Sequence, residues 1–372
     1  GNEPAFIQTV LAHFPSRKTI SFFESLGLLC REEGEGRVYP YCGQASAVLD
    51  SFRTELEHLG VRQLLEYHPQ RIVRQKKGFQ IHCTEGIPSC RRLIVATGGK
   101  SLSSTGSDGS GYRLLQELGH TATKLFPSLT QIRTDPALMR PIKGLRCEGA
   151  VSLLADDKTV RREKGEIQFT EAGLSGICIF QLSRLSGEFF TLHTVNGKPT
   201  RQIAVSLDLM PDWEPSTLTS FLVSRRDCRP YAPLEQFLAG VLNKRVGQTL
   251  LKAAGCAPLH RPSGSLTDSE LSRIAALLKG WRFQPSGLST WNAAQVTAGG
   301  ISCREFSPHT MESRSIPGLY AAGEVLDVDG DCGGFNLQWA WSSGMLAGQG
   351  AAASLLAPLN NQKGAERFAS YR

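Results

Sequence analysis

One stretch near the C-terminal end decides the fold: Gly318-Leu-Tyr-Ala-Ala-Gly-Glu-Val-Leu-Asp-Val-Asp-Gly-Asp-Cys-Gly-Gly-Phe-Asn-Leu-Gln-Trp-Ala-Trp-Ser-Ser-Gly344. Its apolar start predicts a buried strand, and the run from Phe335 predicts a long helix. An acidic loop and two adjacent glycines, Gly333 and Gly334, lie between them. Glycines let the backbone approach a ligand closely, and a helix N-terminus favours negative charge. The stretch therefore predicts a site for a phosphate or another anionic group. Without a ligand, the same residues would form an acidic loop before a glycine-capped helix.

A second strand end of this kind lies earlier in the chain. The apolar run 93–96 predicts a strand buried on both faces, and it leads directly into Thr97-Gly-Gly99. A loop rich in glycine and serine follows over residues 101–111, and residues 112–118 have the apolar spacing of a helix. A buried strand, a glycine turn and a helix make half of a βαβ unit. The predicted fold class is therefore α/β.

The composition is that of an ordinary globular protein. At 372 residues the chain is long enough for two or three domains, and 41% of its residues are hydrophobic and 20% charged. No apolar run approaches the ~18 residues needed to span a bilayer, so no membrane partner is expected.

The net charge of +7 is a mild excess of 41 Lys and Arg over 34 Asp and Glu. The longest basic clusters, Arg71–Lys77 and Arg161–Lys164, are predicted to be solvated strand edges or turns. A modest positive field would also suit an anionic dinucleotide. We therefore expect a small-molecule substrate and no nucleic acid as partner. The oligomeric state is left open.

The ten cysteines form no C-x-x-C pair, and no histidine lies near them at zinc-ligand spacing. We therefore expect no metal site. So many unpaired thiols are typical of a reducing compartment, which predicts a cytoplasmic protein. Cys332 precedes the double glycine and is either a redox partner or incidental.

Composition changes divide the chain into a discontinuous domain and an insert. Residues 1–131 and 291–372 are predicted to form the first, including a helix over residues 45–59 and a small meander that begins with a strand over residues 61–67. The insert is predicted to be rich in β-structure over residues 132–209, with one strand over 189–195, and helical over residues 210–290.

Motifs spread along the chain resemble one family of flavoproteins. They are the C-terminal stretch above, Gly36-Arg-Val-Tyr-Pro40, Ala96-Thr-Gly-Gly99, Ser104-Thr-Gly-Ser-Asp-Gly109, Phe169-Thr-Glu-Ala-Gly-Leu-Ser-Gly176, Ala298-Gly-Gly300 and Thr310-Met-Glu-Ser313. The chain resembles the HI0933-like or BaiN-like family of NAD(FAD)-utilising dehydrogenases, which is also described as aminoacetone-oxidase-like and is bacterial. The resemblance covers nearly the whole chain. It implies FAD as cofactor and a Rossmann-like FAD-binding domain, similar to that of glutathione reductase, with an inserted β-rich and helical domain.

The resemblance also implies roles for single residues. Those expected to bind the cofactor are Pro69, Thr97, Gly98, Gly99, Gly323, Glu324, Asp327, Asp329, Gly330, Gly333, Gly334, Phe335 and Asn336. Pro69 would offer backbone to the adenine, and the residues from Gly333 to Asn336 would meet the flavin ring. Arg37 and Tyr39 are expected on the substrate side. No catalytic residue is assigned.

One departure from the family pattern stands out. Such domains open with a strand, a G-x-G-x-x-G turn and a helix, and an acid follows that binds the ribose. The sequence contains no such turn, because Gly106-Ser-Asp-Gly-Ser-Gly111 has the wrong order and follows the wrong strand. We therefore expect the fold to be incomplete at its N-terminal end, with this segment lacking.

The expected function is an FAD-dependent oxidoreductase that transfers a hydride between a small-molecule substrate, or NAD(P)H, and flavin N5. Because no second dinucleotide motif is present, the sequence favours transient docking of NAD(P)H, or an oxidase route with oxygen, over a two-dinucleotide reductase. The alternative is a truncated or degenerate flavoprotein scaffold that acts as a non-catalytic binding module. A basic, RNA-associated flavoprotein would rest on the net charge alone.

Overall fold

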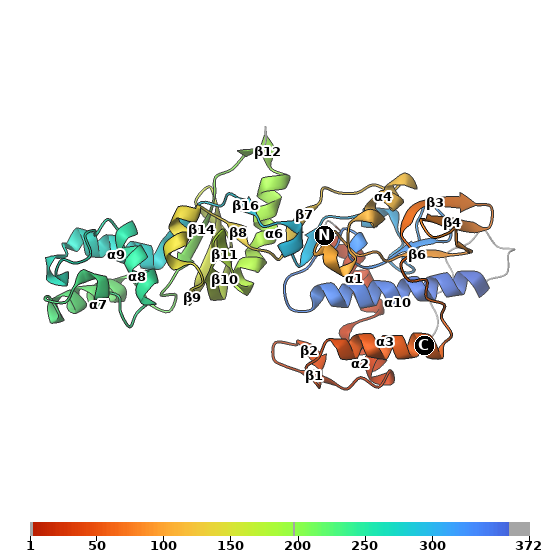
Figure 1. Cartoon of the computed structure of the whole chain (residues 1–372), viewed down its shortest axis with the longest axis horizontal. Helices are drawn as coiled ribbons and strands as arrows, with labels where there is room; N and C mark the ends of the chain where they lie inside the picture. Colours follow the sequence, from red (N-terminus) through yellow and green to blue (C-terminus); the bar gives the residue numbers. More distant parts are fainter. Residues whose placement is uncertain (1–2, 196–197, 357–372) are drawn as a thin grey trace. The chain divides into compact units, whose positions relative to one another are not determined.

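The computed structural model describes residues 3–195 and 198–356, which form two compact units (Figure 1). One unit runs from Phe126 to Ala298 and is called the insert below. The other, called the outer unit, contains the described residues before and after it. We predicted an insert over residues 132–290. The compact unit begins earlier and ends later because β7 (Phe126–Ser128) pairs with β17 (Val296–Ala298).

The outer unit is built around two parallel strands that are far apart in the sequence. In β6 (Leu93–Val95) and β18 (Leu319–Ala321), Leu93 lies opposite Leu319 and Val95 opposite Ala321. Both strands were predicted from their apolar runs. The 22-residue helix α10 (Phe335–Leu356) packs against both, so strands and helix form the α/β arrangement expected of a Rossmann-type domain.

The other outer elements surround this centre. They are α1 (Pro4–His13), α2 (Ser16–Ser25), β1 (Cys30–Glu32), β2 (Val38–Pro40), α3 (Ser46–His58), β3 (Pro69–Gln75), β4 (Gly78–Cys83), β5 (Ser89–Cys90) and α4 (Ser110–Glu117). Helices α3 and α4 confirm two predictions, each within two residues. The strand predicted over residues 61–67 is wrong: β3 is the first strand of its sheet, and Leu64 and Leu65 are exposed without a partner strand.

The insert contains one antiparallel sheet of seven strands, in the order β15-β14-β9-β10-β11-β8-β16. These strands are β8 (Ile132–Arg133), β9 (Arg146–Ala155), β10 (Lys158–Phe169), β11 (Gly173–Ser175), β14 (Ile203–Asp208), β15 (Trp281–Phe283) and β16 (Gly287–Leu288). Helix α5 (Pro136–Met139) and the hairpin of β12 (Thr194–Val195) and β13 (Lys198–Pro199) complete this part.

Part of the predicted strand over residues 189–195 is helical. Helix α6 (Ile177–Thr191) continues through both phenylalanines of that segment, and only β12 is extended. Leu182, Ser186 and Phe189 are buried on one face of α6 at helical spacing. Packing against the sheet therefore overrides the β-propensity of the aromatic residues.

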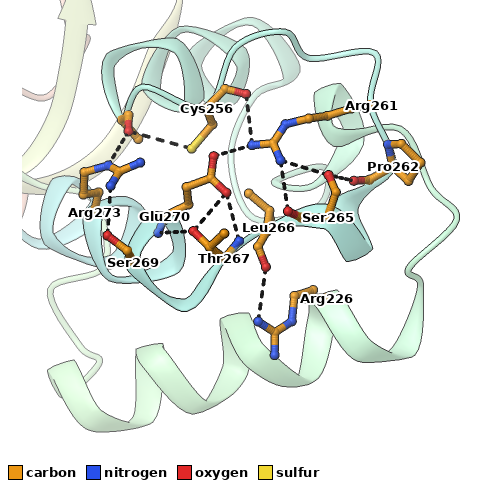
Figure 2. A network of polar contacts seen from close by, with 11 residues as sticks. Arg226, Cys256, Arg261, Pro262, Ser265, Leu266, Thr267, Ser269, Glu270 and Arg273 are labelled. Carbon is orange, nitrogen blue, oxygen red and sulfur yellow. Dashed lines mark hydrogen bonds and ion pairs between the residues drawn. The ribbon is translucent and has the colours of Figure 1, made fainter.

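The helical part of the insert shares its apolar core with the sheet. It contains α7 (Pro215–Cys228), α8 (Lys244–Ala253) and α9 (Asp268–Gly280). Helix α9 begins with a capping box: Thr267 Oγ1 accepts from Glu270 N at 3.2 Å, and the Glu270 carboxylate accepts from Thr267 N at 2.9 Å (Figure 2). Arg261 pairs with the same carboxylate, which joins the preceding loop to the helix. No helix in the described part of the chain is long and apolar enough to cross a membrane.

Candidate functional site

The ends of the two parallel strands bring the first predicted site residues together. Ala322 N donates to Val95 O at 3.0 Å, one step beyond the paired strands. Because β6 and β18 are parallel, the loops that follow them leave the same edge of the sheet. Thr97-Gly-Gly99 and Gly323-Glu324 therefore lie at one edge, although they are more than two hundred residues apart in the sequence.

The loop after β6 contains a buried hydroxyl without a protein partner. Thr97 Oγ1 is inaccessible to solvent and makes no hydrogen bond. Gly111, in the first turn of α4, packs so closely that a Cβ there would lie 1.8 Å from this oxygen. Gly98 has a φ of +72°, which favours glycine. Four buried hydroxyls of the described residues lack a partner, and the other three, Ser128, Thr134 and Ser186, belong to the insert. Thr97 is the one at this strand edge, where a polar ligand could supply the missing partner.

The loop after β18 is fixed by helix α10 on both sides of Gly323. The Gly323 N–H donates to Ser343 Oγ at 2.9 Å, and the Trp339 indole donates to Gly323 O at 3.0 Å. Both side chains are buried. Tyr112 OH from α4 donates to Glu324 O at 3.3 Å. Trp339 and Ser343 are four positions apart on one helix face, a spacing that could have indicated their joint role from the sequence.

The backbone around Asp327 is held by residues 300–303. Ile301 N donates to Val325 O, and Asp327 N donates to Ile301 O, both at 2.9 Å. A Cβ on Gly300 would lie 2.5 Å from the Leu326 carbonyl carbon. Only glycine therefore allows this approach, which gives the predicted Ala298-Gly-Gly300 motif a structural reason.

The double glycine is positioned by Asn336. Its side-chain amide accepts from Gly330 N at 2.8 Å and donates to Gly330 O at 3.0 Å, so the acidic loop is tied to the first turn of α10. Gly333 and Gly334 have φ values of +129° and +90° and are exposed. The exposed backbone of this pair therefore lies at the N-terminus of a long helix, where anionic groups are stabilised.

A comparison with protein families decides the identity of this arrangement. The model described as the HI0933-like protein Rossmann domain matches residues 1–350. The chain belongs to the HI0933-like family. It is an FAD-dependent oxidoreductase, as the resemblance of its motifs implied.

Curated relatives support this membership over most of their length. The HI0933-like chain is 34% identical over 353 residues to the 3-dehydro-bile acid delta(4,6)-reductase of Clostridium scindens, covering 95% of the chain and 84% of the relative. It is 30% identical over 350 residues to the ribosomal RNA dihydrouridine synthase of Escherichia coli, covering 93% and 82%. For the Haemophilus influenzae protein of the same name, the values are 25% over 347 residues, 91% and 80%.

The substrate-side candidates of the HI0933-like chain lie on the β1–β2 hairpin. Tyr39 is partly exposed on β2, and Arg37 pairs with Glu35 just before it. Burial raises the pKa of the Cys332 thiol and nearby Asp331 raises it further, while the positive charge of Arg37 opposes this. Arg37 therefore lies within electrostatic reach of the double-glycine loop. Because the raised pKa keeps the Cys332 thiol protonated at neutral pH, it does not support Cys332 as a redox-active thiolate.

Pro69 lies outside these loops in the sequence, and among the described residues no hydrogen bond joins it to them. It begins β3, opposite Cys83 of β4. The adjacent His68 donates its backbone N–H to Glu85 at 2.9 Å and pairs with the same carboxylate through its ring. In the described residues no group of three His, Cys, Asp or Glu side chains could hold a metal ion.

One polar cluster behind the site was not predicted. His120 Nδ1 lies 2.5 Å from Glu305, and its Nε2 lies 3.2 Å from Ser313 Oγ. Burial alone would raise the pKa of Glu305, but hydrogen bonds from Thr121 and His120 outweigh it, and the pKa is lowered. The cluster resembles a hydrolytic triad in composition only, because Ser313 is buried and its Oγ accepts from Ile316 N at 3.0 Å. It joins residues 185 positions apart, which no local sequence signal reveals.

Proposed function

We propose that the loops at the ends of β6 and β18 hold FAD in this HI0933-like chain and that the enzyme transfers a hydride between the flavin and a substrate. The observation that carries the proposal is that the ends of β6 and β18 lie side by side, with the unsatisfied Thr97 hydroxyl just after one and Gly323, bonded to the N-terminal half of α10, just after the other. When bound, FAD would supply the redox chemistry by exchanging a hydride at N5, with NAD(P)H as its transient reductant.

The residues present fit this cofactor chemically. Carboxylates at Glu324, Asp327 and Asp329 are acceptors suited to ribityl or ribose hydroxyls. Thr97 offers a hydroxyl without a hydrogen-bond partner, and Gly98 and Gly99 follow it as backbone without side chains. The backbone of Pro69 would contact the adenine, as the family resemblance implies.

The N-terminus of α10 would stabilise the negative charge of the reduced flavin ring. Backbone N–H groups and the positive end of the helix dipole at Gly333 and Gly334 stabilise negative charge. Asn336 keeps this turn in place through its two bonds to Gly330. Phe335 is 60% exposed and offers an apolar face to a flat ring.

For the substrate, we propose a carbon–carbon double bond conjugated to a carbonyl group. The two activities named among the relatives, reduction of a delta(4,6) 3-dehydro-bile acid and formation of dihydrouridine, both saturate such a bond. Reduction adds a hydride to one carbon and a proton to the other. Tyr39 has a hydroxyl that can donate this proton, and Arg37 can stabilise negative charge on the carbonyl oxygen.

A second candidate substrate within this class is a uridine in RNA. The relatives named ribosomal RNA dihydrouridine synthases favour it. The degenerate-scaffold alternative predicts no turnover of either substrate.

The test uses the full-length gene product reconstituted with FAD. Under anaerobic conditions, NADH or NADPH should bleach the flavin absorbance, and a conjugated 3-oxo bile acid or unmodified ribosomal RNA should restore it with gain of two hydrogens in the product. Tyr39→Phe should lower kcat by about a hundredfold with little change in KM or in FAD content. Bound flavin that no nicotinamide or oxidant can cycle would support the scaffold instead.

A further inference from the structure

The positive charge of this chain is concentrated in one segment. Seven of the 41 Lys and Arg lie between Tyr67 and Ser107, but only one of the 34 Asp and Glu. This segment therefore carries six of the seven excess charges, and the remainder of the chain is nearly neutral.

The fold gathers four of these cations at one end of the β3–β4–β5 meander. Gln75 pairs with Gly78, so Lys76 and Lys77 form the two-residue turn, and Arg74 pairs with Phe79 next to it. Arg91 lies on the adjacent segment, where its Cα is 2.9 Å from the position that a Cβ on Gly78 would occupy. We call Arg74, Lys76, Lys77 and Arg91 the basic tip. All four are exposed.

The basic tip differs from the other basic cluster in its ion pairs. In the insert, Arg161 pairs with Glu163 at 2.7 Å, Arg162 with Asp208 at 3.1 Å and Lys164 with Asp212 at 2.8 Å. Across the described ranges, no Asp or Glu pairs with any cation of the basic tip. Adjacent like charges without counterions repel one another and oppose folding, so they point to a partner that supplies the negative charge.

The surroundings of the basic tip favour nucleic acid over a membrane. The exposed apolar side chains Leu65 and Ile87 lie before β3 and after β4, at the end of this strand pair opposite the basic tip, and none is exposed between residues 66 and 86. Membrane-surface sites instead combine cations with apolar groups that enter the lipid. Phosphodiester backbones are bound by exposed Lys and Arg without such groups.

The position of the basic tip favours a polymer over a small anion. Arg92, next to Arg91, donates to Ser354 O at 2.8 Å near the C-terminal end of α10. The double glycine lies at the N-terminal end of this helix, whereas β3 and β4 lie toward its C-terminal end (Figure 1). At 1.5 Å per residue, about 30 Å separates Gly334 from Ser354. A small substrate at the double glycine could not also reach the basic tip, but a polynucleotide could.

We propose that the basic tip binds the phosphodiester backbone of RNA. As the route by which a uridine reaches the flavin, this rests on the function proposed above. Binding itself is independent of the flavin.

The experiment compares two variants of equal charge in the full-length protein. The tip variant carries Arg74→Gln, Lys76→Gln and Lys77→Gln, and the control carries Arg161→Gln, Arg162→Gln and Lys164→Gln. Binding of a labelled mixed-sequence RNA oligonucleotide is titrated at several salt concentrations. The tip variant should bind the RNA at least about tenfold more weakly. The slope of log K against log salt should shrink by about 2, because each of the three lost phosphate contacts contributes about 0.7 to the slope. The control should bind like the wild type.

Equal losses in both variants would overturn the proposal, since they would show a diffuse charge effect. A protein that binds no RNA but binds vesicles of anionic phospholipid through the basic tip would also overturn it, because this would indicate a membrane surface. Flavin content is measured on the same samples. RNA binding that depends on the basic tip in protein that never takes up FAD would refute the proposed function and leave this inference standing.

Discussion

Replacing Gly300 with alanine tests whether residues 300–303 position Asp327 for the cofactor. The added Cβ would lie 2.5 Å from the Leu326 carbonyl carbon and 2.6 Å from both Leu326 O and Asp327 N. Ordinary contacts begin near 3.4 Å, so this backbone must move by almost 1 Å. No rotamer change can relieve the clash, because every atom involved is main chain. We expect a loss of about 2–3 kcal/mol in unfolding free energy, the upper range for overpacking.

The same displacement should weaken cofactor binding. A carboxylate moved by about 1 Å loses a charge-assisted hydrogen bond of about 1.5–3 kcal/mol, so the Kd for FAD should rise about ten- to a hundredfold. Urea unfolding without FAD and fluorescence titration with FAD separate the two effects. The control is Gly348→Ala in α10, where no atom lies within 4 Å of the new Cβ and alanine should stabilise by up to about 1 kcal/mol.

Unchanged stability in Gly300→Ala would refute the steric reasoning. Lost stability with an unchanged Kd for FAD would refute the role of this contact in placing Asp327.

Three further changes test other parts of the site. Asn336→Leu removes both bonds to Gly330, so unfolding free energy should fall by about 1–3 kcal/mol and FAD should bind more weakly in calorimetry; wild-type binding would contradict the assigned role. Trp339→Phe removes the donor to Gly323 O, so the free energy of unfolding should fall by about 1 kcal/mol and the Kd for FAD should rise severalfold. A loss of stability without a change in this Kd would limit Trp339 to a packing role. Because the pKa of Glu305 is lowered in the folded state, its stabilising contribution is complete above its unfolded pKa of about 4.3 and disappears as pH falls through the folded value. The stability difference between the wild type and Glu305→Gln should therefore be constant above about pH 5 and shrink below about pH 4, and a pH-independent difference in urea unfolding would exclude this origin.

The strand ends and the double-glycine helix could be predicted because their signals are local. An apolar run that stops at Thr97-Gly-Gly99 or at Gly323 indicates a buried strand and a turn without any knowledge of the partner strand. The helix at Phe335 is equally evident from composition. These features predict the strand ends and the helix start, and the assignment of residues there to the cofactor stays a prediction.

The remaining features depend on contacts between distant segments. The bonds of Ile301 to Val325 and Asp327, and the contact between His120 and Glu305, form only after the chain has folded. Helix α6 continues to Thr191 because its buried face packs on the sheet, which local β-propensity does not report. Most of the basic tip could be recognised in the sequence as a cluster of basic residues, but its lack of ion pairs could be seen only in the structure.

The most direct test of the central claim is the visible absorbance spectrum of the full-length gene product after reconstitution with FAD and removal of unbound cofactor. We expect flavin bands that remain with the wild-type protein and with Gly348→Ala and that are weaker in Gly300→Ala. A wild-type protein that retains no flavin would contradict the claim that the loops after β6 and β18 hold the cofactor, and a Gly300→Ala protein that retains it fully would contradict the part of that claim that concerns Asp327.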